Sequence, residues 1–182
     1  MSNYRRYYNN FNNPVFITIV TKFRKEVLIY YIDKLKESIN KSIKKFKYKF
    51  IAGIILKDHC HIIISTDNPD DIPKIIHDIK HNFTQNLPDE FINSLEGRLT
   101  ASEQKRGEKG VWQRRYYDHI IRNEEDLYKH IDYIHYNSMK HYNIPPKDWE
   151  YSSFKKFVDK GYYNVNWCNF NDKYNINDLD LE

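Results

Sequence analysis

Two apolar runs separated by only two residues constrain the fold of this chain most strongly. Residues 50–56 and 59–65 are rich in branched apolar side chains, and only Lys57 and Asp58 lie between them. A connection this short joins antiparallel strands in a hairpin. The sequence therefore predicts two neighbouring, well-buried strands at this point of the chain.

The second strand of this hairpin carries two histidines one residue apart. Alternate side chains of a strand point to the same face, so His59 and His61 share one face while Cys60, Ile62 and Ile64 share the other. Two imidazoles on one face are a ready pair of metal ligands. The alternative is that they are ordinary histidines, because imidazole also serves as a hydrogen-bonding group in cores.

The first half of the chain contains one more predicted strand and two predicted helices. Residues 15–21 predict a first strand, which we expect to be central. Asp33 is the candidate cap of an amphipathic helix with apolar residues at helical spacing, namely Leu35, Ile39, Ile43 and Phe46. A second helix has Asp70 or Asp71 as its cap, Pro73 in its first turn, and an apolar face of Ile72, Ile75, Ile76, Ile79, Phe83 and Leu87.

The second half begins with a charged segment. Residues 88–110 contain three glycines and dense charge, which predict a loop or a partly disordered insertion. Residues 116–121 predict a last strand, and Asn123 is the candidate cap of a third helix that runs to about residue 141, before two prolines. Residues 145–182 hold enough large apolar side chains to pack back on the domain, including Trp149, Phe154, Trp167 and Phe170.

The order of these elements predicts an α+β fold. Strand, helix, strand, strand, helix and strand match the ferredoxin-like split βαβ arrangement, with an antiparallel sheet and an added C-terminal helix and tail. A chain of 182 residues fits one catalytic domain at residues 1–144, interrupted by the charged segment 88–110, with a C-terminal tail at residues 145–182. No apolar run is long enough for a bilayer and the first ten residues do not resemble a signal peptide, so we expect a cytoplasmic protein with no membrane partner.

Charge and aromatic content favour an anionic partner. The first fifty residues carry twelve Lys or Arg against three Asp or Glu, a net charge of +9. The chain also contains 16 tyrosines, and exposed tyrosines beside cations stack on the bases of single strands. The alternatives are a solvated face of a lysine-rich helix and the composition of an AT-rich genome.

The third predicted helix gathers three polar side chains. Its apolar stripe, which should face the sheet, consists of Leu127, Ile131 and Ile134. Tyr133, Asn137 and Lys140 fall within ~60° of one another, on a different face from that stripe. A phenol can be a nucleophile, an amide oxygen can bind a hard cation, and an ammonium can neutralise a phosphate. The alternative for the tyrosine is packing or stacking, because the chain has many tyrosines.

Several blocks of the sequence resemble a known family. His59-Cys60-His61 resembles the histidine-hydrophobic-histidine (HUH) signature of single-strand DNA endonucleases and transposases. Blocks in the order of the REP-associated tyrosine transposases are YRRYY at residues 4–8, WQRRYYDHIIR at 112–122, HIDYIHYN at 130–137 and DWEYSSF at 148–154. The resemblance covers roughly residues 4–154.

The resemblance implies a catalytic centre. His59 and His61 would bind a divalent ion, Asn137 would complete the metal site, and Tyr133 would attack a DNA phosphate to give a 5′-phosphotyrosine. Mixed imidazole and amide ligands are compatible with Mg²⁺ or Mn²⁺, and ligand type alone does not exclude zinc. The chain departs from the family in Ser138-Met139, where the family usually has Pro-Val, and in residues 88–110, which look longer than usual.

Further residues are candidates for supporting roles. His119 and His130 can orient a ligand or move a proton, with ordinary packing as the alternative. Guanidinium groups match both phosphate and guanine, aromatic rings stack on bases, and an ammonium attracts phosphate. The candidate DNA-binding residues are therefore Tyr4, Arg5, Arg6, Tyr7, Trp112, Arg114, Arg115 and Lys140; the alternative is a basic, aromatic surface without specificity.

The expected function is metal-dependent cleavage and strand transfer on single-stranded or hairpin DNA, without a nucleotide cofactor. The main alternative is a catalytically silent relative that binds DNA hairpins as a regulator, followed by a phosphoesterase that uses water. A monomer is expected rather than a dimer. If Tyr133 lies beside His59 and His61 within one chain, the site is assembled in cis.

Overall fold

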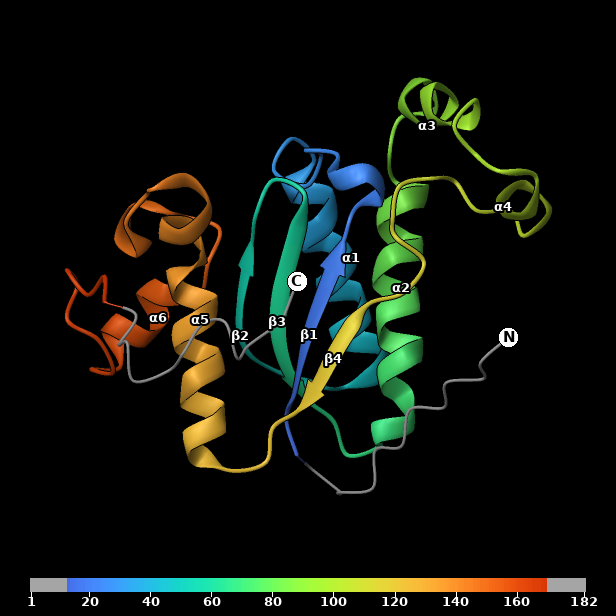
Figure 1. The fold of residues 1–182 in the computed structure, drawn as a ribbon. Helices are drawn as coiled ribbons and strands as arrows, with labels where there is room; N and C mark the ends of the chain where they lie inside the picture. Colours follow the sequence, from blue (N-terminus) through green and yellow to red (C-terminus); the bar gives the residue numbers. More distant parts are fainter. Residues whose placement is uncertain (1–12, 170–182) are drawn as a thin grey trace.

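One antiparallel sheet of four strands forms the centre of the protein. The computed structural model describes residues 13–169. The strands are β1 (Val15–Val20), β2 (Lys49–Ile55), β3 (His59–Ser65) and β4 (Tyr117–Ile120). They lie in the order β2-β3-β1-β4 (Figure 1). This is the strand order of the ferredoxin-like fold, so the α+β prediction is confirmed, as is the central position of β1 and β3.

Helices cover both faces of the sheet. On one face, α1 (Ile32–Phe46) and α2 (Ile72–Gln85) pack on alternate strand residues, including Ile17, Ile62 and Ile64. On the other face, α5 (Glu124–Tyr142) packs on Phe16, Ile54 and Ile63 (Figure 1). The two histidines of β3 lie on the second face, beneath α5, while Cys60 joins the first core. The two-residue period of the strands therefore assigned these side chains to the correct faces.

The charged segment 88–110 contains helices that the sequence prediction missed. They are α3 (Asp89–Glu96) and α4 (Ala101–Lys105). The second begins with a capping box in which Thr100 and Glu103 bond each other's backbone nitrogens. Ile92 and Leu95 of α3 are buried and belong to the same hydrophobic core as the apolar residues of α1 and α2. Two apolar anchors and one cap are enough to order a segment whose composition favours a loop.

Two predicted helix caps differ from the structure. Asp33 lies inside the first turn of α1 and Tyr31 occupies the cap position; a carboxylate in the first turn is also favoured by the helix dipole. Asp71 precedes α2 as predicted, but its side chain makes no cap bond and pairs instead with Lys74 at 2.7 Å. Asn123 does cap α5, because its side chain accepts the backbone N–H of Asp126.

The segment after α5 covers the free edge of β2. It contains the turn η3 (Pro146–Asp148) and the helix α6 (Phe154–Asp159). The Ile55 backbone N–H donates to the Tyr151 carbonyl at 2.8 Å, and the Trp149 indole donates to the Ile55 carbonyl at 3.0 Å. These bonds satisfy the outer backbone groups of an edge strand, which would otherwise be open to pairing with another chain. Phe170, expected to pack here, lies outside the described residues.

A buried polar network holds this segment on α5. The His135 ring bonds Ser153 Oγ at 2.8 Å, and the Tyr163 hydroxyl, 3.2 Å from the other ring nitrogen, donates to Asp132 at 2.6 Å. Burial lowers the pKa of His135 to about 3, and burial also raises the pKa of Asp132.

None of the described helices is both long enough and apolar enough to span a bilayer.

The depressed pKa of His135 predicts a pH-dependent stability. Below the ordinary histidine pKa of 6.5, His135 is protonated in the unfolded chain, whereas in the folded chain it stays neutral down to about pH 3. The free energy of unfolding should therefore fall by about 1.4 kcal/mol per unit as pH drops through this window. His135→Gln should reduce that slope in urea unfolding measured from pH 7 to pH 4. The exposed His77→Gln serves as control, and equal slopes in wild type and His135→Gln would contradict the assignment.

Candidate active site

The predicted site residues converge beneath α5 within one chain. Strand β3 presents His59 and His61 to this face, and α5 presents Tyr133 and Asn137 to the same space. The ring centroids of His59 and His61 are 5.0 Å apart, and those of His61 and Tyr133 are 5.2 Å apart. The sheet and the helix that make this site belong to the same chain, so its parts are assembled in cis.

Each histidine of the pair is oriented by a partner on its Nδ1 atom. His61 Nδ1 is bonded to Thr18 Oγ1 at 2.8 Å, directly across the β1–β3 ladder. His59 Nδ1 is bonded to Asp58 Oδ1 at 2.6 Å. Partners of this kind fix the ring and its tautomer, and they direct Nε2 toward a ligand. The hairpin residue Asp58, predicted only as a turn residue, thus contributes to the site.

The charge of Asp58 is stabilised where it meets His59. Partial burial alone would raise the pKa of this carboxyl, but the hydrogen bond and charge of His59, with the Arg24 guanidinium, outweigh burial and hold it below its ordinary value. Arg24 lies 3.4 Å from both Asp58 Oδ2 and His59 Nδ1. A carboxylate that remains charged keeps its hydrogen bond to the imidazole.

The donor atoms of the site fit a divalent ion. His59 Nε2 and Asn137 Oδ1 are buried, and neither has a hydrogen-bond partner in the part of the chain that the structure describes. Buried polar atoms are normally partnered, so such atoms mark a place for a ligand. Asn137 Nδ2 donates to the Tyr133 carbonyl at 2.6 Å, which turns the amide oxygen the other way. Imidazole nitrogen and amide oxygen together suit a divalent transition metal or a hard cation.

Tyr133 lies on the buried face of α5, which corrects the sequence prediction. It was expected on a different face from the apolar stripe, yet its side chain is only 2% exposed and packs against Phe16. The buried arc of the helix is wide because two parts of the chain cover it: the sheet contacts Tyr133 through His61, and the segment after α5 contacts His135 through Ser153 and Phe157. It comprises Asp126, His130, Ile131, Tyr133, Ile134, His135, Asn137 and Ser138. Lys140 is exposed and holds its Nζ 5.2 Å from the centre of the Tyr133 ring.

His119 and His130 form a separate cluster with Asp126. The Asp126 carboxylate meets His119 Nε2 at 2.9 Å and accepts the backbone N–H of Arg122 at 3.0 Å. Burial would raise the pKa of Asp126, but the bonds from Arg122 and His119 lower it well below its ordinary value. Burial lowers the pKa of His130. The ligand atoms of the three residues lie within 4.8 Å of one another, but the two rings stack at 15°, which does not aim both nitrogens at one ion.

This cluster reaches the candidate site through Phe16. The Phe16 ring lies 4.9 Å from His130, 5.4 Å from His61 and 6.0 Å from Tyr133, measured between centroids. His130 therefore supports the ring on which the nucleophile candidate packs. Sequence reasoning missed Phe16 and Thr18 because their roles depend on cross-strand register, which periodicity alone does not supply. It missed Arg24 because the contact with Asp58 joins residues far apart in the sequence.

His141 is a further neighbour that sequence reasoning did not single out. Its ring lies 4.9 Å from that of His59, and it follows Asn137 by about one turn of α5. The residue ends the block Asn137-Ser138-Met139-Lys140-His141. Attention to that block, two turns after the tyrosine, could have revealed it.

The candidate DNA-binding residues are not all at this site. Tyr4, Arg5, Arg6 and Tyr7 lie outside the described residues. Arg114 and Arg115 are exposed near the β4 edge of the sheet. Trp112 is half-buried against Phe83, and its indole donates to the Lys80 carbonyl at 3.2 Å, so packing occupies much of its ring.

Comparison with known proteins places the chain in a family. The family model described as "Transposase IS200 like" matches residues 10–137, which include both histidines of the pair, Tyr133 and Asn137. The chain belongs to the IS200-like transposases. This IS200-like transposase is 37% identical over 170 residues to a REP-associated tyrosine transposase of Haemophilus influenzae, covering 92% of this chain and 93% of the relative. The resemblance to the REP-associated group is thereby confirmed.

Two further relatives support the same family assignment. A REP-associated tyrosine transposase of Escherichia coli is 29% identical over 170 residues, covering 92% of each chain. The solved structure of a REP-associated tyrosine transposase bound to a REP hairpin superposes on this transposase with a TM-score of 0.74 and 28% identity. The superposition covers 93% of this chain and 92% of the other. The relatives therefore extend over nearly the whole chain.

The bond between Thr18 and His61 predicts a measurable contribution to metal binding. Thr18→Val keeps the shape of a fully buried side chain but removes the partner of His61 Nδ1. We expect Mn²⁺ to bind about 10- to 100-fold more weakly, because losing an orienting partner has effects of this size at metal sites. Isothermal titration calorimetry measures this directly. Thr66→Val, just after the end of β3, is the matched control. Unchanged Mn²⁺ affinity in Thr18→Val would show that the bond does not orient a ligand.

Proposed function

We propose that this transposase cleaves single-stranded DNA next to a hairpin and transfers the cut strand through a covalent tyrosine intermediate. The observation that carries the proposal is the position of Tyr133, whose ring lies 5.2 Å from that of His61 in the same chain. A nucleophile candidate beside a pair of oriented imidazoles is the arrangement that phosphodiester cleavage by a tyrosine requires.

The proposed metal ligands are His59, His61 and Asn137. When bound there, Mg²⁺ or Mn²⁺ would polarise the non-bridging oxygens of the phosphate and offset the negative charge that develops in the transition state. Thr18 and Asp58 hold the two rings in place. Asn137 is held by its own bond to the Tyr133 carbonyl, so the amide ligand and the nucleophile are positioned by the same helical turn.

The reaction follows from the chemistry of the phenol. The Tyr133 oxygen attacks phosphorus, a bond between them forms, and the bond from phosphorus to the 3′ oxygen breaks. The proton of the phenol is lost and the 3′ oxygen leaves as a hydroxyl group, which leaves a 5′-phosphotyrosine. Attack by the 3′ hydroxyl of another strand reverses these changes, so no nucleotide cofactor is required. The Lys140 ammonium, 5.2 Å from the ring, lies where it can attract the phosphate.

Hairpin DNA is the proposed substrate. A relative of the same group has been solved bound to a REP hairpin, and the similarity to that structure covers 93% of this chain. The N-terminal residues Tyr4, Arg5, Arg6 and Tyr7 supply the stacking and guanidinium groups that such a partner needs. Because the site is assembled within one chain, a monomer is sufficient for the proposed chemistry.

One observation favours a catalytically silent, hairpin-binding regulator as a second candidate. Tyr133 is only 2% exposed, so a phosphate reaches its hydroxyl only if side chains around it move. A protein that binds hairpins without cutting them would have no need for that movement. The retained ligands His59, His61 and Asn137 favour the enzyme, and covalent attachment to DNA separates the two candidates.

Tyr133→Phe should abolish covalent attachment to DNA. A labelled hairpin oligonucleotide with single-stranded flanks is incubated with protein and Mn²⁺, and adducts are resolved on a denaturing gel. Wild type should form an adduct that chelation of the metal prevents, whereas Tyr133→Phe should bind the DNA without forming one. Tyr128→Phe, an exposed tyrosine of the same helix, should react like wild type. An adduct in Tyr133→Phe would refute the nucleophile, and none in wild type would favour the silent regulator.

A further inference from the structure

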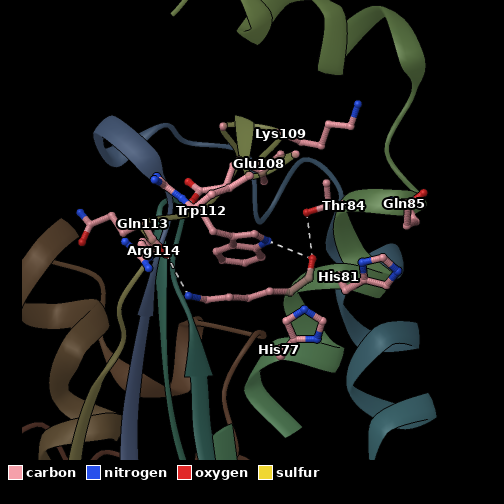
Figure 2. Close-up of a pocket in the computed structure, with 14 residues that line it drawn as sticks. His77, His81, Thr84, Gln85, Glu108, Lys109, Trp112, Gln113 and Arg114 are labelled. Carbon is pink, nitrogen blue, oxygen red and sulfur yellow. Dashed lines mark hydrogen bonds and ion pairs between the residues drawn. The ribbon is translucent and has the colours of Figure 1, made fainter. Parts of the chain in front are cut away.

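A basic pocket lies on the side of the sheet away from Tyr133. It has a volume of about 330 Å³ and is formed by α2 and residues 106–114 (Figure 2). Trp112 lies across its centre, and the indole donates to the Lys80 carbonyl. His77 and His81, one helical turn apart, form the wall on the α2 side, with parallel rings 5.8 Å between centroids. The proposed cleavage site does not use this pocket.

The lining of the pocket is strongly cationic. Its basic side chains are Lys80, Arg106, Lys109 and Arg114, and Glu108 is its acid. Glu108 is neutralised within the pocket, because it pairs with Arg106 at 2.6 Å. The Lys80 Nζ donates to the Gln113 carbonyl at 2.9 Å, which keeps this ammonium at the wall. The exposed Lys109 and Arg114 add two further positive charges to the lining, beside the two imidazoles, and this combination favours a phosphate.

The backbone at the edge of the sheet is shaped to expose the arginines. Thr21 forms a bridge with Trp112, and a regular ladder would then pair Thr18 with Arg115. Thr18 pairs instead with Tyr117, so two extra residues lie in the edge strand. Such a bulge interrupts the ladder and redirects side chains. Arg114 and Arg115 lie within it, and both are exposed.

This edge is close to the histidine end of β3. The Gln113 backbone N–H donates to the Val20 carbonyl at 2.9 Å, and Val20 pairs with His59 in the neighbouring strand. Residue 113 is therefore two strand spacings, or about 10 Å, from His59 along the hydrogen-bonding direction. A DNA strand that leaves the metal site across this edge reaches the pocket after a short path.

We propose that this pocket binds a backbone phosphate of the single-stranded flank that continues from the DNA at Tyr133. The inference rests on the proposed function for the position of the DNA, and it adds a second anchor that fixes the path of the flank. Lys109 and Arg114 provide exposed charges in the lining, and Trp112 lies at the centre of the pocket (Figure 2). Lys80 also lines it. A phosphate contact is independent of sequence, so this anchor positions the strand rather than reading it.

The test compares DNA flanks of different length. The probe is a DNA hairpin with single-stranded oligothymidine extensions of increasing length on either side, and affinity is measured against salt concentration. The variant Lys109→Gln/Arg114→Gln removes two exposed charges and leaves the packed residues of the pocket intact. The control Lys44→Gln/Lys49→Gln removes two exposed charges from α1 and β2.

The expected result is specific to long flanks. Wild type and control should gain affinity once the extension on one side spans the sheet edge, whereas the pocket variant should lose this gain. On the long-flank probe, the slope of log affinity against log salt should be smaller by about 2 for the pocket variant than for wild type. On the hairpin alone the two slopes should be equal. Equal slopes for wild type and pocket variant on every probe, or an equal loss in the control, would overturn the proposal.

A covalent assay separates this result from the proposed function. With an oligonucleotide too short to reach the pocket, the pocket variant should form the Tyr133 adduct as wild type does. If wild type forms no adduct while the pocket variant still loses the long-flank gain, the catalytic proposal fails and the phosphate anchor stands. If adducts form normally but flank length has no effect on wild type, only the anchor fails.

Discussion

The antiparallel pairing of β3 with β1 is the constraint on which the site depends. It places Thr18 directly opposite His61, and the resulting 2.8 Å bond fixes one imidazole, while the hairpin turn supplies Asp58 to fix the other. The same pairing puts Phe16 under α5, where it touches His61, His130 and Tyr133. A shift of one residue in the pairing register of β3 would move both histidines to the face covered by α1 and α2, and the site beneath α5 would be lost.

The face beneath α5 combines a core with a polar site. Ile54, Ile63, Ile131 and Ile134 bury apolar surface there, and this burial holds the helix against the sheet. Polar groups at the same face are tolerated because most are bonded, as with Asn137 and the Tyr133 carbonyl. The exceptions include His59 Nε2, Asn137 Oδ1, His130 Nε2 and Ser138 Oγ, buried atoms that lack a partner among the described residues. Stability therefore comes from the apolar part of this interface, and the unsatisfied atoms include those of the candidate metal ligands His59 and Asn137.

Much of the fold and part of the site followed from the sequence. Alternation in the strands placed His59 and His61 on one face, and helical spacing brought Tyr133 and Asn137 together. The face of Tyr133 was mispredicted, because spacing gives the angle between side chains but not how wide an arc the sheet will bury. The helices of residues 88–110 were missed because their order depends on Ile92 and Leu95 packing on a distant core. Thr18 and Phe16 could not be assigned to the site either, because periodicity gives the face of a side chain but not which residue of the neighbouring strand lies beside it.

Both edges of the sheet are modified in ways that matter for solubility. The β2 edge is bonded by residues 151–153 of its own chain, through the Ile55 and Gly53 backbone groups. The β4 edge is short, and its two extra residues break the row of donors and acceptors beside two arginines. Aggregation through strand addition needs a long, regular, uncharged edge. A protein with such a basic, aromatic-rich sequence can therefore expose one sheet edge to a negatively charged polymer without offering it to other copies of itself.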